Sequence, residues 1–213
     1  MSIRLRVLLG VGVFVLLVLA SVATAAEPAL WLRYPAISPD GETIVFSYRG
    51  DIYRVSSTGG TATPLTVHPA HDTMPVWSPD SSLIAFASNR YGNNDVFVMD
   101  AAGGPAKRLT VHSAGDLPTS FTPDGAKVLF SSTRLDAASC VQFPSRVQSE
   151  LYEVSLEGGL PRQILSTPAL FAGWDSSGER MVYTDEKSYE ELTRKHDNSS
   201  FARDVWIYDP SNG

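Results

Sequence analysis

The sequence predicts an all-β fold, a β-propeller of four-stranded antiparallel blades, and three observations support this. A turn motif, Ser-Pro-Asp-Gly or a close variant, recurs along the chain, and Asp80 and Asp124 of two copies lie 44 residues apart. A second turn, Gly-Gly or Asn-Gly, comes eight residues after the acidic residue that opens the third strand of each unit. The apolar runs between these turns are short and lack the 3.6-residue period of helices. Short strands at this repeat length are typical of propeller blades.

The composition narrows the class of protein. The chain has 213 residues, 43% of them hydrophobic, and a formal net charge of -6. An acidic chain without basic blocks lacks the electrostatic footprint of a nucleic-acid-binding protein. The single cysteine, Cys140, excludes an internal disulfide and a cysteine-rich zinc site.

The first 25 residues resemble an export signal rather than part of the fold. Arg4 and Arg6 precede an apolar run from Val7 to Ala20, and Ala23-Thr24-Ala25 follows as a small-residue cleavage site. The alternative is an uncleaved membrane anchor, for which the 17 residues from Val7 to Ala23 are at the short limit. We therefore predict a signal peptide over residues 1–25, a periplasmic or secreted mature chain, and no membrane association after cleavage.

The repeats divide residues 29–213 into three full blades and most of a fourth. We expect the blades at about 34–68, 74–112, 118–167 and 170–213. In the second unit the expected strands are Met74–Ser78, Leu83–Ser88, Asp95–Asp100 and Lys107–Val111. Proline presets φ in the first turn of each unit, and paired glycines supply positive φ in the last. Strands that are apolar on both faces, such as Leu83–Ser88, indicate burial between neighbouring sheets.

Two insertions lengthen the connections between second and third strands. They are Leu135–Ser149 in the third unit and Glu186–Arg203 in the fourth. Such loops lie on one rim of a propeller, where partners or substrates usually meet it. The alternative is that they are solvated surface loops without a ligand.

Two histidines and two aspartates occupy matching repeat positions. His68 and His112 each precede an aspartate, Asp72 or Asp116, by four residues. A repeated pair of this kind fits a metal or acid–base site, but it also fits a structural hydrogen bond that recurs once per blade. We favour the structural interpretation because active sites are rarely duplicated in register.

Two arginines form the candidate binding site. Arg90 and Arg134 share a repeat position just after the second strand, from which they are able to reach the channel or rim and bind carboxylates. The alternative is that they donate hydrogen bonds to loop carbonyls. Asp40, Asp80 and Asp124 belong to the turn motifs, where we expect them to accept hydrogen bonds from backbone amides.

Motifs for catalysis are missing from the sequence. It contains no G-x-S-x-G, H-E-x-x-H, glycine-rich phosphate loop or C-x-x-C. We therefore predict no catalytic residue, no metal and no cofactor in this chain.

The motifs together resemble the N-terminal propeller of bacterial tricorn-protease homologues. The segments that carry the resemblance are Leu30–Pro35, Ile37–Gly41, Gly50–Tyr53, Pro75–Asp80 and Ser88–Asn93. The Pro-Asp motif alone is shared with TolB and other propellers, whereas the opening from Leu30 through Asp51 is more specific. The resemblance spans almost all of residues 29–213.

This resemblance implies a role without catalysis. Members of the family are similar to large secreted serine peptidases whose propellers gate the passage of peptides, and the catalytic domains lie downstream in the same chain. The implied partners are peptide or protein substrates, those downstream domains and a possible second copy in a homo-oligomer. Two alternatives stay open: a TolB-like periplasmic binding propeller, and the propeller of a prolyl-oligopeptidase-like enzyme.

Overall fold

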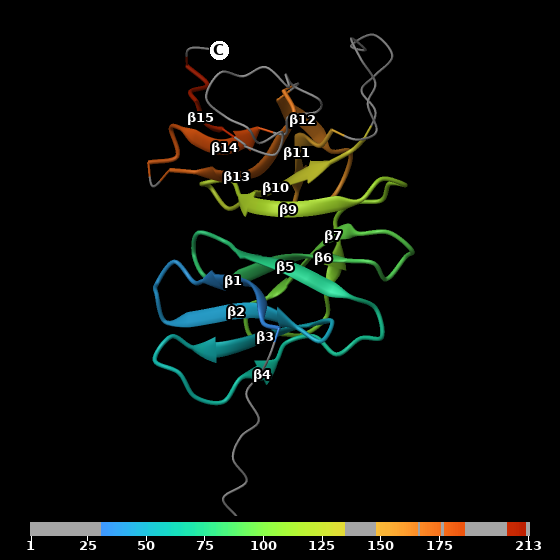
Figure 1. Cartoon of the computed structure of the whole chain (residues 1–213), viewed down its shortest axis with the longest axis vertical. Coiled ribbons are helices and arrows are strands. Elements are labelled where there is room, and N and C mark those ends of the chain that lie inside the picture. The colour runs from blue at the N-terminus through green and yellow to red at the C-terminus, as the bar shows by residue number, and fades with distance from the viewer. Residues whose placement is uncertain (1–30, 135–147, 166, 176, 186–203, 212–213) are drawn as a thin grey trace, which may run out of the picture. The chain divides into compact units, whose positions relative to one another are not determined.

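The fold consists of four successive antiparallel sheets (Figure 1). The computed structural model describes residues 31–134, 148–165, 167–175, 177–185 and 204–211. Every regular element in these ranges is a strand, and they include no helix with the length and apolarity needed to cross a bilayer. The predicted signal peptide and nearly all of both predicted insertions fall outside the described residues.

Each sheet is one blade, and its strands pair in chain order. The first blade holds β1 (Arg33–Ile37), β2 (Thr43–Tyr48), β3 (Asp51–Ser56) and β4 (Thr63–Pro64). The second holds β5 (Asp72–Trp77), β6 (Leu83–Ser88), β7 (Asp95–Asp100) and β8 (Lys107–Arg108). The third holds β9 (Asp116–Phe121), β10 (Lys127–Ser132), β11 (Glu150–Ser155) and β12 (Arg162–Leu165). The fourth holds β13 (Ala169–Trp174), β14 (Met181–Asp185) and β15 (Val205–Tyr208). The all-β propeller prediction is thus confirmed.

The strand boundaries differ from the predicted ones at a β-bulge. β6 and β7 have the predicted bounds, but β5 spans Asp72–Trp77 rather than Met74–Ser78, and β8 ends at Arg108 rather than at Val111. The register of β5 on β6 shifts between Thr73 and Val76, and Met74 within this bulge has a φ of 54°. The strand therefore continues on the far side of the bulge, which places Asp72 opposite Ser88.

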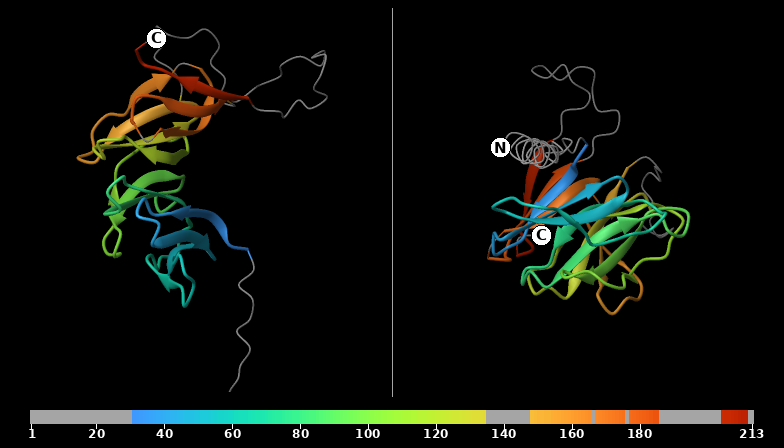
Figure 2. Two further views of the ribbon diagram at one scale, coloured as in Figure 1. Left: turned by 90° about the vertical axis from the view of Figure 1, so that its left-hand side faces the viewer. Right: turned by 90° about the horizontal axis from the view of Figure 1, so that it is seen from below.

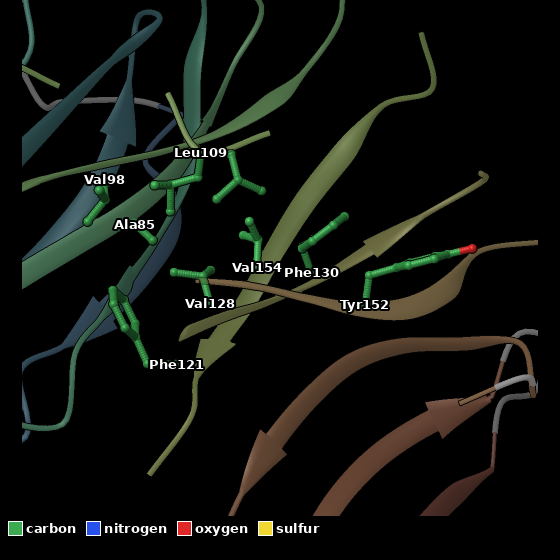
Figure 3. Close-up of a cluster of buried hydrophobic side chains, with 9 residues drawn as sticks. Ala85, Val98, Leu109, Phe121, Val128, Phe130, Tyr152 and Val154 are labelled. Atoms are coloured by element: carbon green, nitrogen blue, oxygen red, sulfur yellow. The ribbon is translucent and has the colours of Figure 1, made fainter. Parts of the chain in front are cut away.

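Apolar clusters join each sheet to the next. The cluster between the second and third blades is drawn in Figure 3, where side chains from both blades point toward one another. It contains Ala85, Val96, Val98, Leu109, Phe121, Val128, Phe130, Tyr152 and Val154. Similar clusters join the first blade to the second and the third to the fourth. Figure 2 shows the same succession of sheets from two further directions.

The last blade leaves one face exposed. Residues of β7 and β15 occupy equivalent positions, and Val96, Phe97 and Val98 of β7 are 0%, 3% and 7% exposed. Their counterparts in β15, Val205, Trp206 and Ile207, are 68%, 50% and 65% exposed. Val205 and Ile207 lie on the face that in β7 packs against the next blade, and Trp206 lies on the opposite face. In the described residues β15 is the edge of its sheet and no further sheet follows it, so these residues meet solvent.

The antiparallel order gives each blade two different ends. One end, here named the turn rim, holds the turns between first and second strands (38–42, 78–82 and 122–126) and the hairpins at 57–62 and 101–106. The other end, named the connection rim, holds the loops between second and third strands (49–50 and 89–94) and the links between blades (65–71 and 109–115).

On the turn rim, each motif aspartate organises its own turn. Its carboxylate accepts a hydrogen bond from the motif's first side chain and another from a backbone amide two residues further on. The hydroxyl-to-carboxylate distances are 2.5 Å for Ser38 and Asp40, 2.6 Å for Ser78 and Asp80, and 2.6 Å for Thr122 and Asp124. These hydroxyl donors lower the pKa of all three aspartates, that of Asp80 to about 2.

Candidate functional site

The connection rim gathers most of the residues singled out in the sequence. Arg90, Arg134, His68, His112, Asp72 and Asp116 all lie on it or directly beneath it. The fold brings them to one end because loops between second and third strands and links between blades share that end. The candidate site is therefore this rim.

Each predicted binding arginine is paired with a buried aspartate of its own blade. Arg90 Nη2 donates to Asp72 Oδ2 at 2.8 Å. Arg134 donates from both Nε and Nη2 to the two carboxylate oxygens of Asp116, with 3.1 Å between Nε and Oδ1. Both aspartates are fully buried. The pairing differs from the loop-carbonyl alternative and leaves both guanidinium groups occupied by a carboxylate.

Aromatic rings complete these two pairs. The guanidinium carbon of Arg90 lies 5.6 Å and 5.2 Å from the ring centroids of Phe86 and Phe97, which stack at 5.8 Å. In the third blade, Arg134 lies in the same way over Phe130 and Tyr152. A guanidinium that is held by ring faces and a buried carboxylate is a rigid part of the blade.

The first blade lacks this arrangement. Leu32 and Gly50 stand at the positions of the aspartate and the arginine. The stacked pair of Phe46 and Tyr53 is present, but the edge of Tyr48 packs on Tyr53 at 5.7 Å where the other blades have an arginine. The ion pair is thus an addition to the two central blades rather than a requirement of every blade.

The repeated histidines do not bond to the aspartates four residues later. Nδ1 of His68 accepts a hydrogen bond from the Ala70 backbone amide at 2.9 Å, and Nδ1 of His112 accepts one from Ala114 at 2.9 Å. A ring nitrogen that accepts carries no proton, so each neutral imidazole bears its proton on Nε2. Both side chains are exposed. Nδ1 of each ring therefore stabilises the link between blades, and Nε2–H is available as a hydrogen-bond donor.

The aspartates that open the third strands also fix the connection rim. Asp51 Oδ1 accepts from the His68 backbone amide at 3.1 Å and from Thr66 Oγ1 at 3.3 Å. Asp95 is fully buried and accepts from Arg108 Nη2 at 2.6 Å. Burial raises the pKa of Asp95; Arg108 opposes this shift and the Asp116 carboxylate of the next blade reinforces it.

Sequence reasoning overlooked two threonines of this network. Thr66 Oγ1 accepts from the Ile52 amide, and Thr110 Oγ1 accepts from the Val96 amide, both at 2.9 Å. The signal for them was present in the repeated Leu-Thr-Val-His segments of the first two units. Among the described residues, no group of three or more His, Cys, Asp or Glu side chains is placed to hold a metal ion.

Comparisons with known proteins agree with this fold. TolB from Acinetobacter baumannii superimposes with a TM-score of 0.63 at 19% identity, covering 86% of this chain and 42% of that chain. The tricorn protease superimposes with a TM-score of 0.62 at 15% identity, covering 88% of this chain and 22% of that chain. An oligogalacturonate lyase in complex with manganese gives 0.56 at 15% identity, with 84% and 50% covered.

These structural matches show the fold, and this chain spans less than half of the length of the TolB and tricorn chains. No curated protein sequence matches it. The family is shown by a match of residues 29–213 to the family model for the tricorn protease N-terminal beta propeller domain. On that match, which covers the whole described propeller, the chain belongs to the family of tricorn protease N-terminal β-propeller domains.

Proposed function

We propose that this chain is the non-catalytic propeller of an exported tricorn-like serine peptidase, in which it admits or holds peptides that the catalytic domains cleave. The family match over residues 29–213 is the observation that carries the proposal. The catalytic domains would belong to a longer polypeptide, and the basic-apolar-small order of residues 1–25 would direct it to the periplasm or outside the cell.

The exposed face of β15 supports a place within a larger assembly. Val205 and Ile207 match Val96 and Val98 of β7, which pack against the following blade. Leaving such a face in water is unfavourable by about 25 cal/mol for each Å² of apolar surface. A neighbouring blade of the same propeller would remove this cost.

A second candidate function is a TolB-like binding propeller without catalysis. It is supported by the superposition on TolB from Acinetobacter baumannii, with a TM-score of 0.63, which is a likeness of fold. In that case the connection rim would bind a partner protein, and no peptidase activity would accompany it.

The two candidates differ in the size of the native protein. An antibody raised against residues 29–213 would be used on the exported fraction of the host, with the cytoplasmic fraction as the control. We expect a band several times heavier than the 23.1 kDa of this chain, and we expect that band to react with a fluorophosphonate label for active serines. A single exported band near 23.1 kDa without labelling would replace the peptidase by the binding propeller.

A further inference from the structure

Exposed charge is divided unequally between the two rims. On the turn rim, exposed carboxylates recur in every described turn between first and second strands of the first three blades, and one more ends β7. They are Asp40, Glu42, Asp80, Asp100 and Asp124. Between residues 48 and 134, the carboxylates of the connection rim are buried or half-buried, and each accepts a hydrogen bond. These are Asp51, Asp72, Asp95 and Asp116. The connection rim of the first two blades therefore presents no exposed carboxylate in its described residues.

Arg49 is a cation that this rim presents to solvent, with exposed Arg33 at the start of β1 as a second one. It is exposed, and within the described part of the chain its guanidinium lies within 4.0 Å of no carboxylate. Its recorded contact is with the ring face of Tyr48, at 5.3 Å from guanidinium carbon to ring centroid. Arg90 and Arg134, in contrast, are neutralised by buried aspartates. The free positive charge of the rim thus lies in the first blade, where the ion pair is missing.

Arg49 is also held in an unfavourable backbone conformation. It has a φ of 53° and Gly50 has a φ of 95°, so the two residues form the tight turn between β2 and β3. Turns of this kind favour Asn-Gly, and a side chain such as arginine costs about 1 kcal/mol in the left-handed region. A strained residue that the fold does not need invites a functional explanation.

Two exposed histidines lie on the same rim, in the links that follow the first and second blades. In His68 and His112 the ring proton is on Nε2, because Nδ1 accepts a hydrogen bond from a backbone amide. Both side chains are exposed, so these Nε2–H groups face solvent. The links that carry them are held in place from below. Asn93 Nδ2 donates to the carbonyl oxygens of His112 and Ala114 at 2.9 Å and 2.8 Å, and Asp51 holds the His68 amide. Donors on fixed backbone lose little entropy when they bind a ligand.

We propose that the connection rim of the first two blades binds acidic side chains of a polypeptide, with Arg49 as the charged contact and His68 and His112 as hydrogen-bond donors. The rim is free of exposed carboxylates, so an acidic segment meets attraction there and repulsion at the turn rim. The inference rests on the proposed peptide-handling function only in that it takes the ligand to be a polypeptide.

The test is a binding assay on the chain itself with a fluorescein-labelled poly-glutamate peptide whose C-terminus is amidated. The amide removes the terminal carboxylate, so only side-chain carboxylates are measured. A matched poly-glutamine peptide is the neutral probe. We expect fluorescence anisotropy to show salt-sensitive binding of the glutamate peptide and much weaker binding of the glutamine peptide.

Arg49→Gly is the decisive variant because glycine adopts this φ without strain, so the fold is preserved. We expect about a tenfold loss of affinity for poly-glutamate. Arg54→Gln is the matched control: it removes one exposed positive charge from the same blade, in the middle of β3, and should keep the affinity within about twofold. Equal losses in both variants, no loss in Arg49→Gly, or equal binding of both peptides would overturn the proposal.

A double variant, His68→Ala with His112→Ala, tests the two donors separately. We expect a further loss of about threefold, smaller than that of Arg49→Gly because neutral donors bind carboxylates less strongly than a cation. An unchanged affinity would remove the histidines from the proposed surface. All these measurements use the chain alone, so an exported band near 23.1 kDa would end the peptidase proposal without affecting them.

Discussion

The third strands of the second and fourth blades carry similar apolar residues, yet one strand is buried and the other is exposed. Val96 and Val98 of β7 pack against the third blade, whereas Val205 and Ile207 of β15 face solvent. Both are third strands, but β7 lies between β6 and β8, whereas β15 is the edge of its sheet in the described residues. Burial of a blade therefore depends on its neighbours more than on its own sequence, and a blade becomes part of a core only when the next one is present.

The largest difference in stability is expected when the two equivalent aromatic residues of β7 and β15 are replaced by alanine. Phe97→Ala should destabilise the chain by about 3–5 kcal/mol, because Phe97 is buried and stacks on Phe86. Trp206→Ala should cost about 1–2 kcal/mol, less than Phe97→Ala, since half of the residue already meets water. Urea unfolding measures both. Similar losses would show that β15 is covered in solution.

The next effect concerns the ion pairs that mark the central blades. Asp72→Leu should cost about 3 kcal/mol, because it leaves the Arg90 guanidinium without its carboxylate. Adding Arg90→Gly recreates the Leu and Gly of the first blade and should restore at least half of the lost free energy of unfolding. A double-mutant cycle in urea measures this recovery. A double variant that is less stable than Asp72→Leu would show that Arg90 stabilises the blade through its contacts with the rings of Phe86 and Phe97 alone.

A smaller effect on stability is expected at the turns between the first and second strands of the second and third blades. Ser81 has a φ of 61°, and Gly125 stands at the equivalent position with a φ of 69°. Ser81→Gly should stabilise the chain by about 1 kcal/mol, and Gly125→Ser should destabilise it by about the same amount. Thermal unfolding would reveal both shifts. Changes of the same sign in the two variants would contradict a conformational origin.

The smallest expected effect is the pH dependence of these turns. The hydroxyls of Ser78 and Ser82 lower the pKa of Asp80 to about 2 from 3.8. A lowered pKa stabilises the folded state fully above the unfolded value, and this contribution is lost as the pH falls from 3.8 toward 2. The stability difference between the wild type and Asp80→Asn should therefore shrink over that interval. A difference that stays constant down to pH 2 would contradict the ionised capping role.

Much of the fold was predictable because turns and strands are local. The Pro-Asp and Gly-Gly turns fixed the ends of β6 and β7, and apolar runs indicated strands covered on both faces. The bulge at Met74 was not predictable, since a positive φ at a methionine results from pairing with β6 rather than from its own preference.

The site was less predictable because its contacts join residues far apart in the chain. Arg90 and Asp72 were both recognised as repeat positions, but their pairing depends on the register of β5 on β6. One sequence signal was available: the first unit has Leu32 and Gly50, so it lacks both partners together. The free charge of Arg49 was not predictable, because it depends on the pairing of Arg90 and Arg134 with aspartates of their own blades.

The backbone bonds between blades have a consequence for how the chain unfolds. The first residue of a blade donates to the preceding blade in three places: Asp72 to Gly50 at 2.7 Å, Asp116 to Asn94 at 2.8 Å, and Ala169 to Ser149 at 2.8 Å. Within the described residues each blade is thus tied to its sequence neighbours, as in repeat proteins, where stability is a sum of units and nearest-neighbour interfaces. Opening should start at β1 and β15 and move inward, so amide hydrogens of β7 and β10 should be the last to exchange with solvent.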